Sequence, residues 1–93
     1  MQQSLLLCLQ IARLYDRRQV TIGTIAMVKA ACTANCREVA ALARNVMGAD
    51  GILLENQAMK TLLDIEAVHT FEGSFEINTL VSGREMTGIS ALR

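Results

Sequence analysis

Residues 22–47 are the longest stretch of the sequence with a helical pattern of apolar side chains. The apolar positions recur at intervals of three or four, which is the spacing of one face of an α-helix. They are Ile25, Val28, Cys32, Val39, Leu42 and Val46. Alanines fill many positions between them and leave the other faces narrow, so neighbouring helices can approach on several sides. We therefore expect one long helix, capped by Thr21 and ended by the two glycines of residues 48–51.

The rest of the chain predicts three more helices, over residues 2–15, 55–68 and 75–86. Proline, the commonest helix breaker, is absent, and aromatic residues make up only 3% of the chain, so its apolar content is aliphatic. With 93 residues, the chain is a single domain, residues 1–93. The prediction is an all-α fold, an antiparallel four-helix bundle. Because the first helix begins at Gln2 without a clear cap, we expect the domain to come from a longer chain.

Charge and cysteine content narrow the classes of partner. Nine basic side chains balance nine acidic ones, which predicts neither a nucleic-acid nor a membrane partner. The apolar run at residues 5–9 is too short to span a bilayer. Three cysteines without a secretion signal predict reduced thiols. Cys32 and Cys36 are four positions apart, but there is no second cysteine pair and the one histidine is distant, so we expect no metal site.

Residues 68–78 form a short break between two helical segments and contain one carboxylate, Glu72, directly before a glycine. Gly73 allows a tight turn and the close approach of another group. Ser74 is a good cap for the helix that follows, and Glu76 falls in its first turn, where a negative charge suits the helix dipole. Such a turn could place Glu72 for catalysis, but an ordinary interhelical turn is the commoner explanation of this pattern alone. His69, just before the break, is expected to be an exposed polar residue.

The last predicted helix, residues 75–86, should place its apolar side chains toward the other helices. The residues expected inward are Phe75, Leu80, Val81 and Met86, and those expected outward are Arg84 and Glu85.

Two motifs resemble those of the acyl-CoA dehydrogenases. The segment Phe71-Glu72-Gly73-Ser74 resembles the family's Tyr-Glu-Gly-Thr signature, and residues 45–52 resemble its Gln-x-x-Gly-Gly-x-Gly loop. The separation of the two motifs and the closing residues 82–88 also fit. The resemblance covers essentially the whole chain and corresponds to the C-terminal helical domain of the family. Within the family, residues 8–14 and 65–73 are most similar to the glutaryl-CoA dehydrogenase branch.

This resemblance implies an FAD-dependent enzyme that oxidises a short-chain or dicarboxylic acyl-CoA to the 2,3-enoyl-CoA. Glu72 matches the family's base, which removes the α-proton while the β-hydrogen leaves as hydride to the flavin. Gly73 is implied to let the substrate thioester lie close to the main chain. Ser74, in place of the family's threonine, and Asn78, in place of a frequent glutamine, are implied to contact the flavin.

A second set of residues is implied to contact the FAD of a neighbouring subunit. These residues are Asn45, Val46, Met47, Gly48 and Ala49. Asn45 replaces the family's glutamine and Ala49 its second glycine. The resemblance further implies a homotetramer, with electron-transfer flavoprotein as the electron acceptor. It implies a cytoplasmic location in a bacterium and the mitochondrial matrix or peroxisome in a eukaryote.

Two alternatives to the dehydrogenase stay open from the sequence. An acyl-CoA oxidase of the same fold would pass its electrons to oxygen. A non-catalytic helical oligomerisation module would need Glu72 for nothing beyond stability. In either flavoenzyme, the main flavin site and most of the acyl-CoA pocket would lie upstream, so residues 1–93 alone are expected to be inactive.

Overall fold

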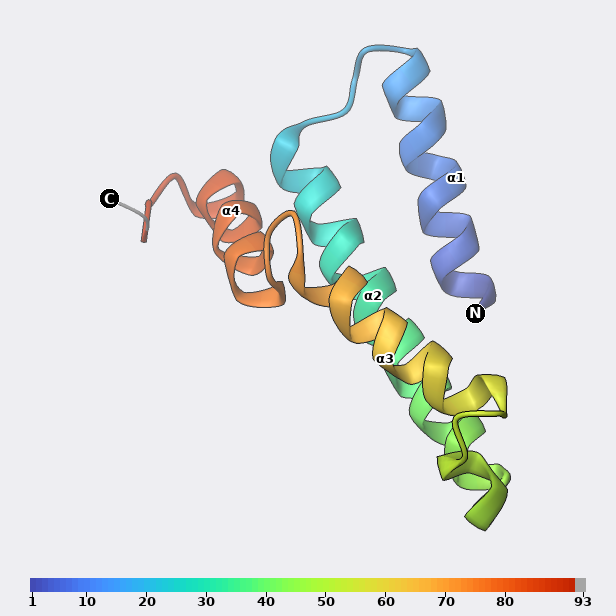
Figure 1. Cartoon of the computed structure of the whole chain (residues 1–93). Coiled ribbons are helices and arrows are strands. Elements are labelled where there is room, and N and C mark those ends of the chain that lie inside the picture. The colour runs from blue at the N-terminus through green and yellow to red at the C-terminus, as the bar shows by residue number, and fades with distance from the viewer. Residues whose placement is uncertain (92–93) are drawn as a thin grey trace.

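The computed structural model describes residues 1–91 and contains four α-helices and one 3-10 segment (Figure 1). The elements are α1 (Gln2–Asp16), α2 (Ile22–Val46), η1 (Gly48–Ile52), α3 (Gln57–Thr70) and α4 (Phe75–Thr87). The prediction of an all-α fold is confirmed, and the helix bounds agree with the sequence pattern to within about two residues, the usual margin for helix ends. The last two residues of the predicted domain, Leu92 and Arg93, lie outside the described part.

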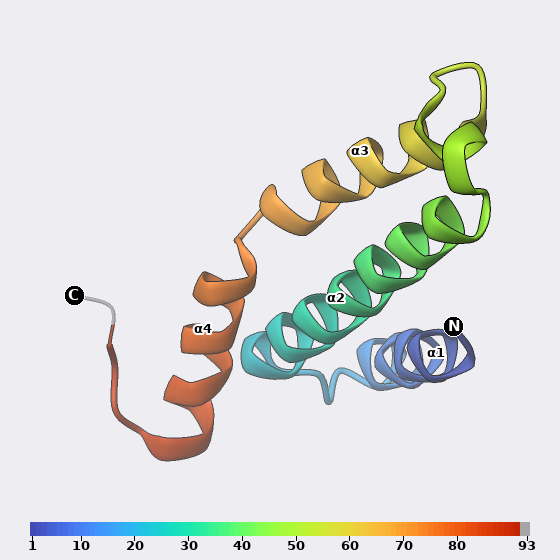
Figure 2. The ribbon, with the colours of Figure 1, turned by 90° about the horizontal axis from the view of Figure 1, so that it is seen from below.

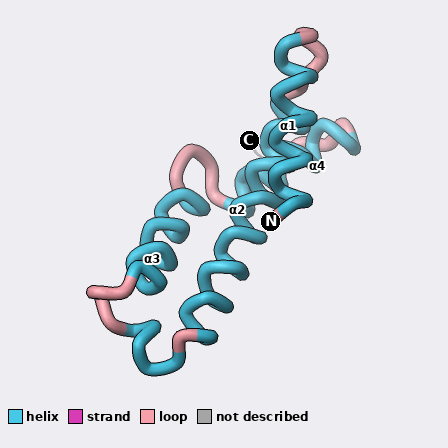
Figure 3. The backbone as a smooth tube through the Cα atoms, turned by 90° about the vertical axis from the view of Figure 1, so that its right-hand side faces the viewer, coloured by secondary structure: helices cyan, strands magenta, loops and turns pink. Residues whose placement is uncertain are grey.

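Helix α2 is the element on which the other helices pack. α1 runs back along its first half, α3 runs back along its second half, and α4 lies across its N-terminal end (Figures 1 and 2). All extensive contacts between α-helices of residues 1–91 involve α2. The molecule is accordingly an open array, 48 × 31 × 16 Å, and its thinnest dimension is less than two helix diameters of about 10 Å. Figure 3 shows the wide separation of α3 from α1.

The buried face of α2 consists of small side chains. Its most buried residues include Ala26, Val28, Ala30 and Ala40. The predicted stripe is confirmed at Val28, which is buried, but four of its six residues are exposed, namely Ile25 (44%), Val39 (38%), Leu42 (54%) and Val46 (89%). The alanine faces explain the difference: they let helix backbones approach closely, and the branched side chains are then left outside the contacts.

The N-terminus of α2 is held by its own cap and by α4. The Thr21 hydroxyl accepts a hydrogen bond from the amide of Thr24 (3.2 Å), as predicted for a cap. The Thr21 hydroxyl also donates to the Glu85 carboxylate, which accepts a second bond from the amide of Gly23 (2.9 Å). Glu85, expected to point outward, therefore links α4 to α2. Met86, expected to face inward, is 80% exposed.

Within residues 1–91, every helix is too short or too polar to cross a bilayer.

Candidate functional site

The turn between α3 and α4 has two consecutive residues with positive φ. Phe71 ends α3 in an extended conformation, and then Glu72 and Gly73 have φ values of 53° and 93°. This region is freely available to glycine, but a residue with a side chain costs roughly 1–2 kcal/mol there. Glu72 therefore carries backbone strain, and such strain persists only where surrounding contacts hold it.

Lys29 of α2 provides contacts on both sides of Glu72. Its Nζ atom donates to the carbonyl oxygen of Phe71 (2.5 Å) and to that of Gly73. The same ammonium group lies 6.0 Å from the centroid of the Phe71 ring, within reach of a cation–π interaction. One half-buried cation thus binds the residue before Glu72 and the residue after it.

Asn78 holds the turn from the side of α4. The side chain is buried, and its Nδ2 atom donates to the carbonyl oxygens of Gly73 (2.6 Å) and Ser74 (3.0 Å). A Cβ atom added at Gly73 would lie 3.0 Å from that nitrogen, so glycine suits this position by its conformation and by its size. The flavin contact implied for Asn78 stays a prediction, because here both donated bonds remain within the turn.

Ser74 caps α4 as the sequence predicts. Its hydroxyl oxygen accepts a bond from the amide of Ile77 (3.4 Å), and the hydroxyl donates to the Glu76 carboxylate (2.9 Å). The backbone amide of Glu76 and the Ser74 hydroxyl lower the pKa of the Glu76 carboxyl. The Ser74 proton is therefore used inside the cap, and its oxygen is left to accept bonds.

The carboxylate of Glu72 is exposed and has neither a hydrogen bond nor an ion pair with any residue of the described chain. The backbone on both sides of Glu72 is held by hydrogen bonds from Lys29, while the Glu72 side chain has no bonding partner. A fixed main chain with a free carboxylate is suited to take a proton from a bound ligand, because a general base must be positioned and unpaired.

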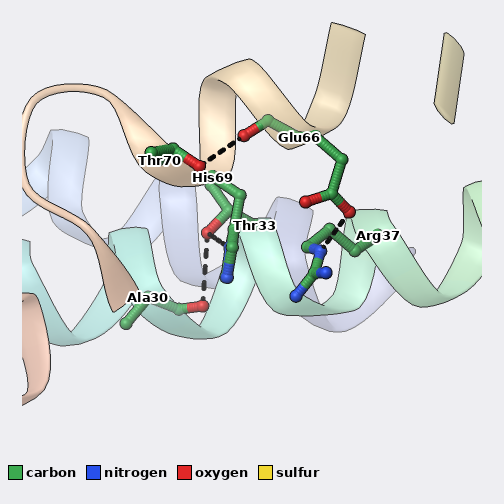
Figure 4. A network of polar contacts seen from close by, with 6 residues as sticks. All are labelled: Ala30, Thr33, Arg37, Glu66, His69 and Thr70. Atoms are coloured by element: carbon green, nitrogen blue, oxygen red, sulfur yellow. Dashed lines mark hydrogen bonds and ion pairs between the residues drawn. The ribbon is translucent and has the colours of Figure 1, made fainter. Parts of the chain in front are cut away.

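His69 is not the exposed polar residue that the sequence suggested. It is half-buried, its Nδ1 lies 2.9 Å from the hydroxyl of Thr33, and its ring stacks on Phe75 with centroids 5.7 Å apart. The Thr33 hydroxyl donates to the carbonyl of Lys29 (2.9 Å), and since a hydroxyl has one proton, His69 Nδ1 is then the donor to Thr33. Figure 4 shows this contact between α2 and α3.

A second contact joins the same two helices farther along. Arg37 of α2 and Glu66 of α3 form an ion pair of 2.6 Å (Figure 4). Both side chains are 45% exposed, so the pair contributes little stability by itself. Together with the His69–Thr33 bond it sets the position of α3 along α2, and so the point at which the turn begins.

The predicted flavin loop is not brought to the Glu72 turn. Asn45, Val46, Met47, Gly48 and Ala49 are exposed at the far end of α2 (Figure 1). Lys29, beside the turn, and Val46 are roughly 25 Å apart along the helix, at about 1.5 Å per residue. Gly48 has φ 58° and open space where a side chain would stand. Glu72, Gly73, Ser74 and Asn78 therefore form one group, and residues 45–49 form another.

Sequence reasoning missed Lys29 and the Thr33–His69 pair. Lys29 lies 42 positions from Phe71, and Thr33 lies 36 positions from His69. The sequence contains one weak signal for these contacts. Lys29 and Thr33 are the polar residues of a stretch, residues 28–34, that otherwise consists of alanine, valine and cysteine. A charged side chain on such a face must find polar partners, because a buried charge is costly without them.

The cysteines and other metal-binding residue types form no site of their own in residues 1–91. No three His, Cys, Asp or Glu side chains gather there in a group that could hold a metal ion. Cys8 and Cys32 are free thiols whose sulfur atoms lie 3.8 Å apart, between α1 and α2. Burial, and secondly the contact with Cys8, raise the pKa of the Cys32 thiol, which keeps it protonated.

The chain was compared with known proteins. Residues 1–87 match the family described as acyl-CoA dehydrogenase, C-terminal domain. A glutaryl-CoA dehydrogenase from Mycobacterium smegmatis superposes with a TM-score of 0.90 at 34% identity, covering 96% of this chain. A structure of a glutaryl-CoA dehydrogenase from the same organism in complex with FADH2 gives a TM-score of 0.88 at 30% identity over 95% of this chain. The chain spans 23% of the length of each.

Proposed function

Because the chain belongs to the acyl-CoA dehydrogenase family, matching its C-terminal domain over residues 1–87, we propose that it serves an FAD-dependent acyl-CoA dehydrogenase. The substrate class is a short-chain or dicarboxylic acyl-CoA, which the likeness to glutaryl-CoA dehydrogenases supports. The single observation that carries the catalytic part is the free carboxylate of Glu72 on a turn held from both sides.

Glu72 acts in this proposal as the base. Its carboxylate takes the α-proton of the acyl thioester, and the electron pair of that bond forms the double bond as a hydride leaves the β-carbon. Bound FAD supplies the acceptor for the hydride. Gly73, which has no side chain, lets the thioester approach the main chain beside the base. Closing of the site around the substrate excludes water and strengthens the carboxylate as a base.

A flavin shared between two copies of the chain would use both groups of residues. The exposed loop with its open backbone at Gly48 and the turn at Ser74 are too far apart in one copy to meet the same ring system. We assign the loop contacts of one copy to Asn45, Val46, Met47, Gly48 and Ala49, and the turn contacts of the other to Ser74 and Asn78. A shared flavin needs at least two copies of the chain, and the number four in the proposed homotetramer follows from the family alone. Electron-transfer flavoprotein, the proposed electron acceptor, follows from the family alone.

The test uses the complete polypeptide that contains residues 1–93, loaded with FAD and made anaerobic. Addition of glutaryl-CoA, butyryl-CoA or isobutyryl-CoA should bleach the visible flavin band with at least one of them. Glu72→Gln should keep FAD and still bind the substrate, but reduce its flavin at least about 100-fold more slowly, because general bases contribute about 10²–10⁴-fold. Glu55→Gln, at an exposed carboxylate away from the turn, is the control and should behave as wild type.

The other outcomes change either the role of Glu72 or the proposed function. Normal flavin reduction by Glu72→Gln would show that Glu72 is not the base. Rapid recolouring when air is re-admitted would indicate an acyl-CoA oxidase. A polypeptide that takes up no FAD would favour the oligomerisation module, for which the exposed apolar side chains of α1 are the supporting observation.

A further inference from the structure

The ammonium group of Lys29 lies between two main-chain carbonyls that flank a strained residue. One carbonyl belongs to Phe71, at the end of α3, and the other to Gly73, just before α4. Within residues 1–91, Lys29 is the one side chain of α2 that hydrogen-bonds to residues 71–73, and its two partners stand on either side of Glu72. The contact is therefore centred on the proposed base without touching its carboxylate.

A lysine is well suited to this position. Its ammonium has three donors around one atom, so two carbonyls can converge on it, and no acceptor is needed in return. Hydrogen bonds from a charged donor are stronger than neutral ones. The two carbonyls belong to peptide units separated by one other unit, so bringing them to one point restricts the backbone between them, which includes the positive φ of Glu72.

We propose that Lys29 is a positioning residue for Glu72, holding the turn in the conformation from which the carboxylate reaches the substrate. The inference rests on the proposed function, since it gives Glu72 the role of base. Lys29 itself contacts backbone rather than substrate, so its loss changes where the carboxylate stands without removing any group that binds the substrate. A displacement of about 1 Å at a reacting group lowers rates by about 100-fold.

A purely structural lysine would give a different result. If Lys29 only joined α2 to the α3–α4 turn, its removal would lower thermal stability, and the flavin-reduction rate of the folded, FAD-loaded protein would stay normal. A positioning residue lowers the limiting rate of flavin reduction at saturating substrate while the substrate dissociation constant stays close to its wild-type value. Measuring both the flavin-reduction rate and the substrate dissociation constant of the folded variant therefore distinguishes a positioning role from a purely structural one.

The experiment compares Lys29→Met and Lys29→Arg with a control, Lys60→Met, in the complete polypeptide loaded with FAD. Methionine keeps an unbranched apolar stem and removes every donor, whereas arginine keeps the charge and several donors. Lys60 is exposed on α3, away from the turn. Anaerobic stopped-flow measurement should show flavin reduction about 10- to 100-fold slower in Lys29→Met. Substrate affinity should change less than about threefold, about half of a tenfold step in free energy. Lys29→Arg should recover most of the rate, and Lys60→Met should match wild type.

Hydrogen exchange of the amides of residues 71–75 gives a second readout that does not depend on turnover. Lys29→Met should speed exchange there while the middle of α2 stays protected. If Lys29→Met does not fold, Lys29→Gln takes its place. Wild-type rates in a folded variant lacking the lysine, or a loss of rate explained wholly by weaker substrate binding, would overturn the inference.

Failure of the proposed function is recognised separately. A wild-type protein whose flavin no acyl-CoA reduces contradicts the dehydrogenase proposal, and with it the catalytic meaning of Lys29. Exchange at residues 71–75 then still decides whether Lys29 holds the turn.

Discussion

Glu76 in the first turn of α4 is a carboxylate whose contribution to stability depends on its charge. Its own amide and the Ser74 hydroxyl lower its pKa in the folded protein. A lowered folded-state pKa means that the stabilisation is complete above the unfolded value of about 4.3 and is lost as pH falls through the folded value. The Ser74 cap should therefore be weakened by acid.

Glu76→Gln tests this residue directly. The variant should unfold at a lower temperature than wild type at pH 7, and the gap between the two midpoints should shrink as the pH falls below about 4.3. Thermal unfolding followed by circular dichroism across a pH series measures it. Ser74→Ala should reduce the same pH dependence, since it removes the side-chain partner. A gap that is independent of pH would show that the charge of Glu76 plays no part.

At this scale, the sequence predicts contacts between near neighbours and misses those between distant ones. The cap at Ser74 and the placement of Glu76 follow from residues two or three positions apart. The bond from Lys29 to the turn and the His69–Thr33 bond join positions separated by more than 30 residues. Their pairing depends on the register of α3 against α2, which the residue pattern of either helix alone does not specify.

At the scale of elements, one carboxylate of α4, in addition to the packing of the two helices, binds the start of α2. Glu85 accepts from the Gly23 amide and from the Thr21 hydroxyl, so it satisfies a free donor of the helix N-terminus from outside the helix. Its negative charge also lies at the positive end of the α2 dipole. The side chain is packed so closely that a Cβ added at Gly23 would stand 2.5 Å from the carboxylate.

Glu85→Ala should lower the free energy of unfolding by about 1–2 kcal/mol, the range for losing a helix cap. Denaturant unfolding measures the change, and Glu38→Ala, at an exposed glutamate of α2, is the control. Equal stability of the two variants would mean that the bonds between Glu85 and α2 contribute nothing net. Gly23→Ala should be destabilising for a different reason, the contact between its new methyl group and Glu85.

The bounds of the helices were predictable because they depend on local signals, namely caps at Thr21 and Ser74 and glycines after the helix ends. The buried face of α2 was not. Periodicity identifies which apolar residues share a face, but here the alanine face is the one the chain itself covers, and Leu42 and Val46 remain exposed. Which face is buried depends on what surrounds the helix, and that lies outside the periodic pattern.

On the scale of the whole molecule, a large apolar surface remains uncovered. Leu5, Leu6 and Leu9 of α1 are 60%, 66% and 46% exposed, and among the helices of residues 1–91 α1 packs extensively on α2 alone. Exposed apolar surface of this kind favours association.

We expect isolated residues 1–93 to self-associate. Sedimentation velocity over a range of concentrations should show an average mass that rises above the monomer value. The paired substitution Leu5→Lys and Leu9→Lys, one turn apart on the same face of α1, should shift the protein toward monomer. A wild-type chain that stays monomeric at all concentrations would contradict the expectation.

The arrangement of three helices around α2 also bears on how such a domain can diverge. α1 shares no extensive contact with α3 or α4, whereas the Glu72 turn depends on α2, α3 and α4 alone. Substitutions at sites without shared partners act nearly independently. The outer surface of α1 can therefore accumulate substitutions that suit new neighbouring domains or subunits while the Glu72 turn keeps its geometry. The assembly of the protein can then change in evolution without a change in its proposed chemistry.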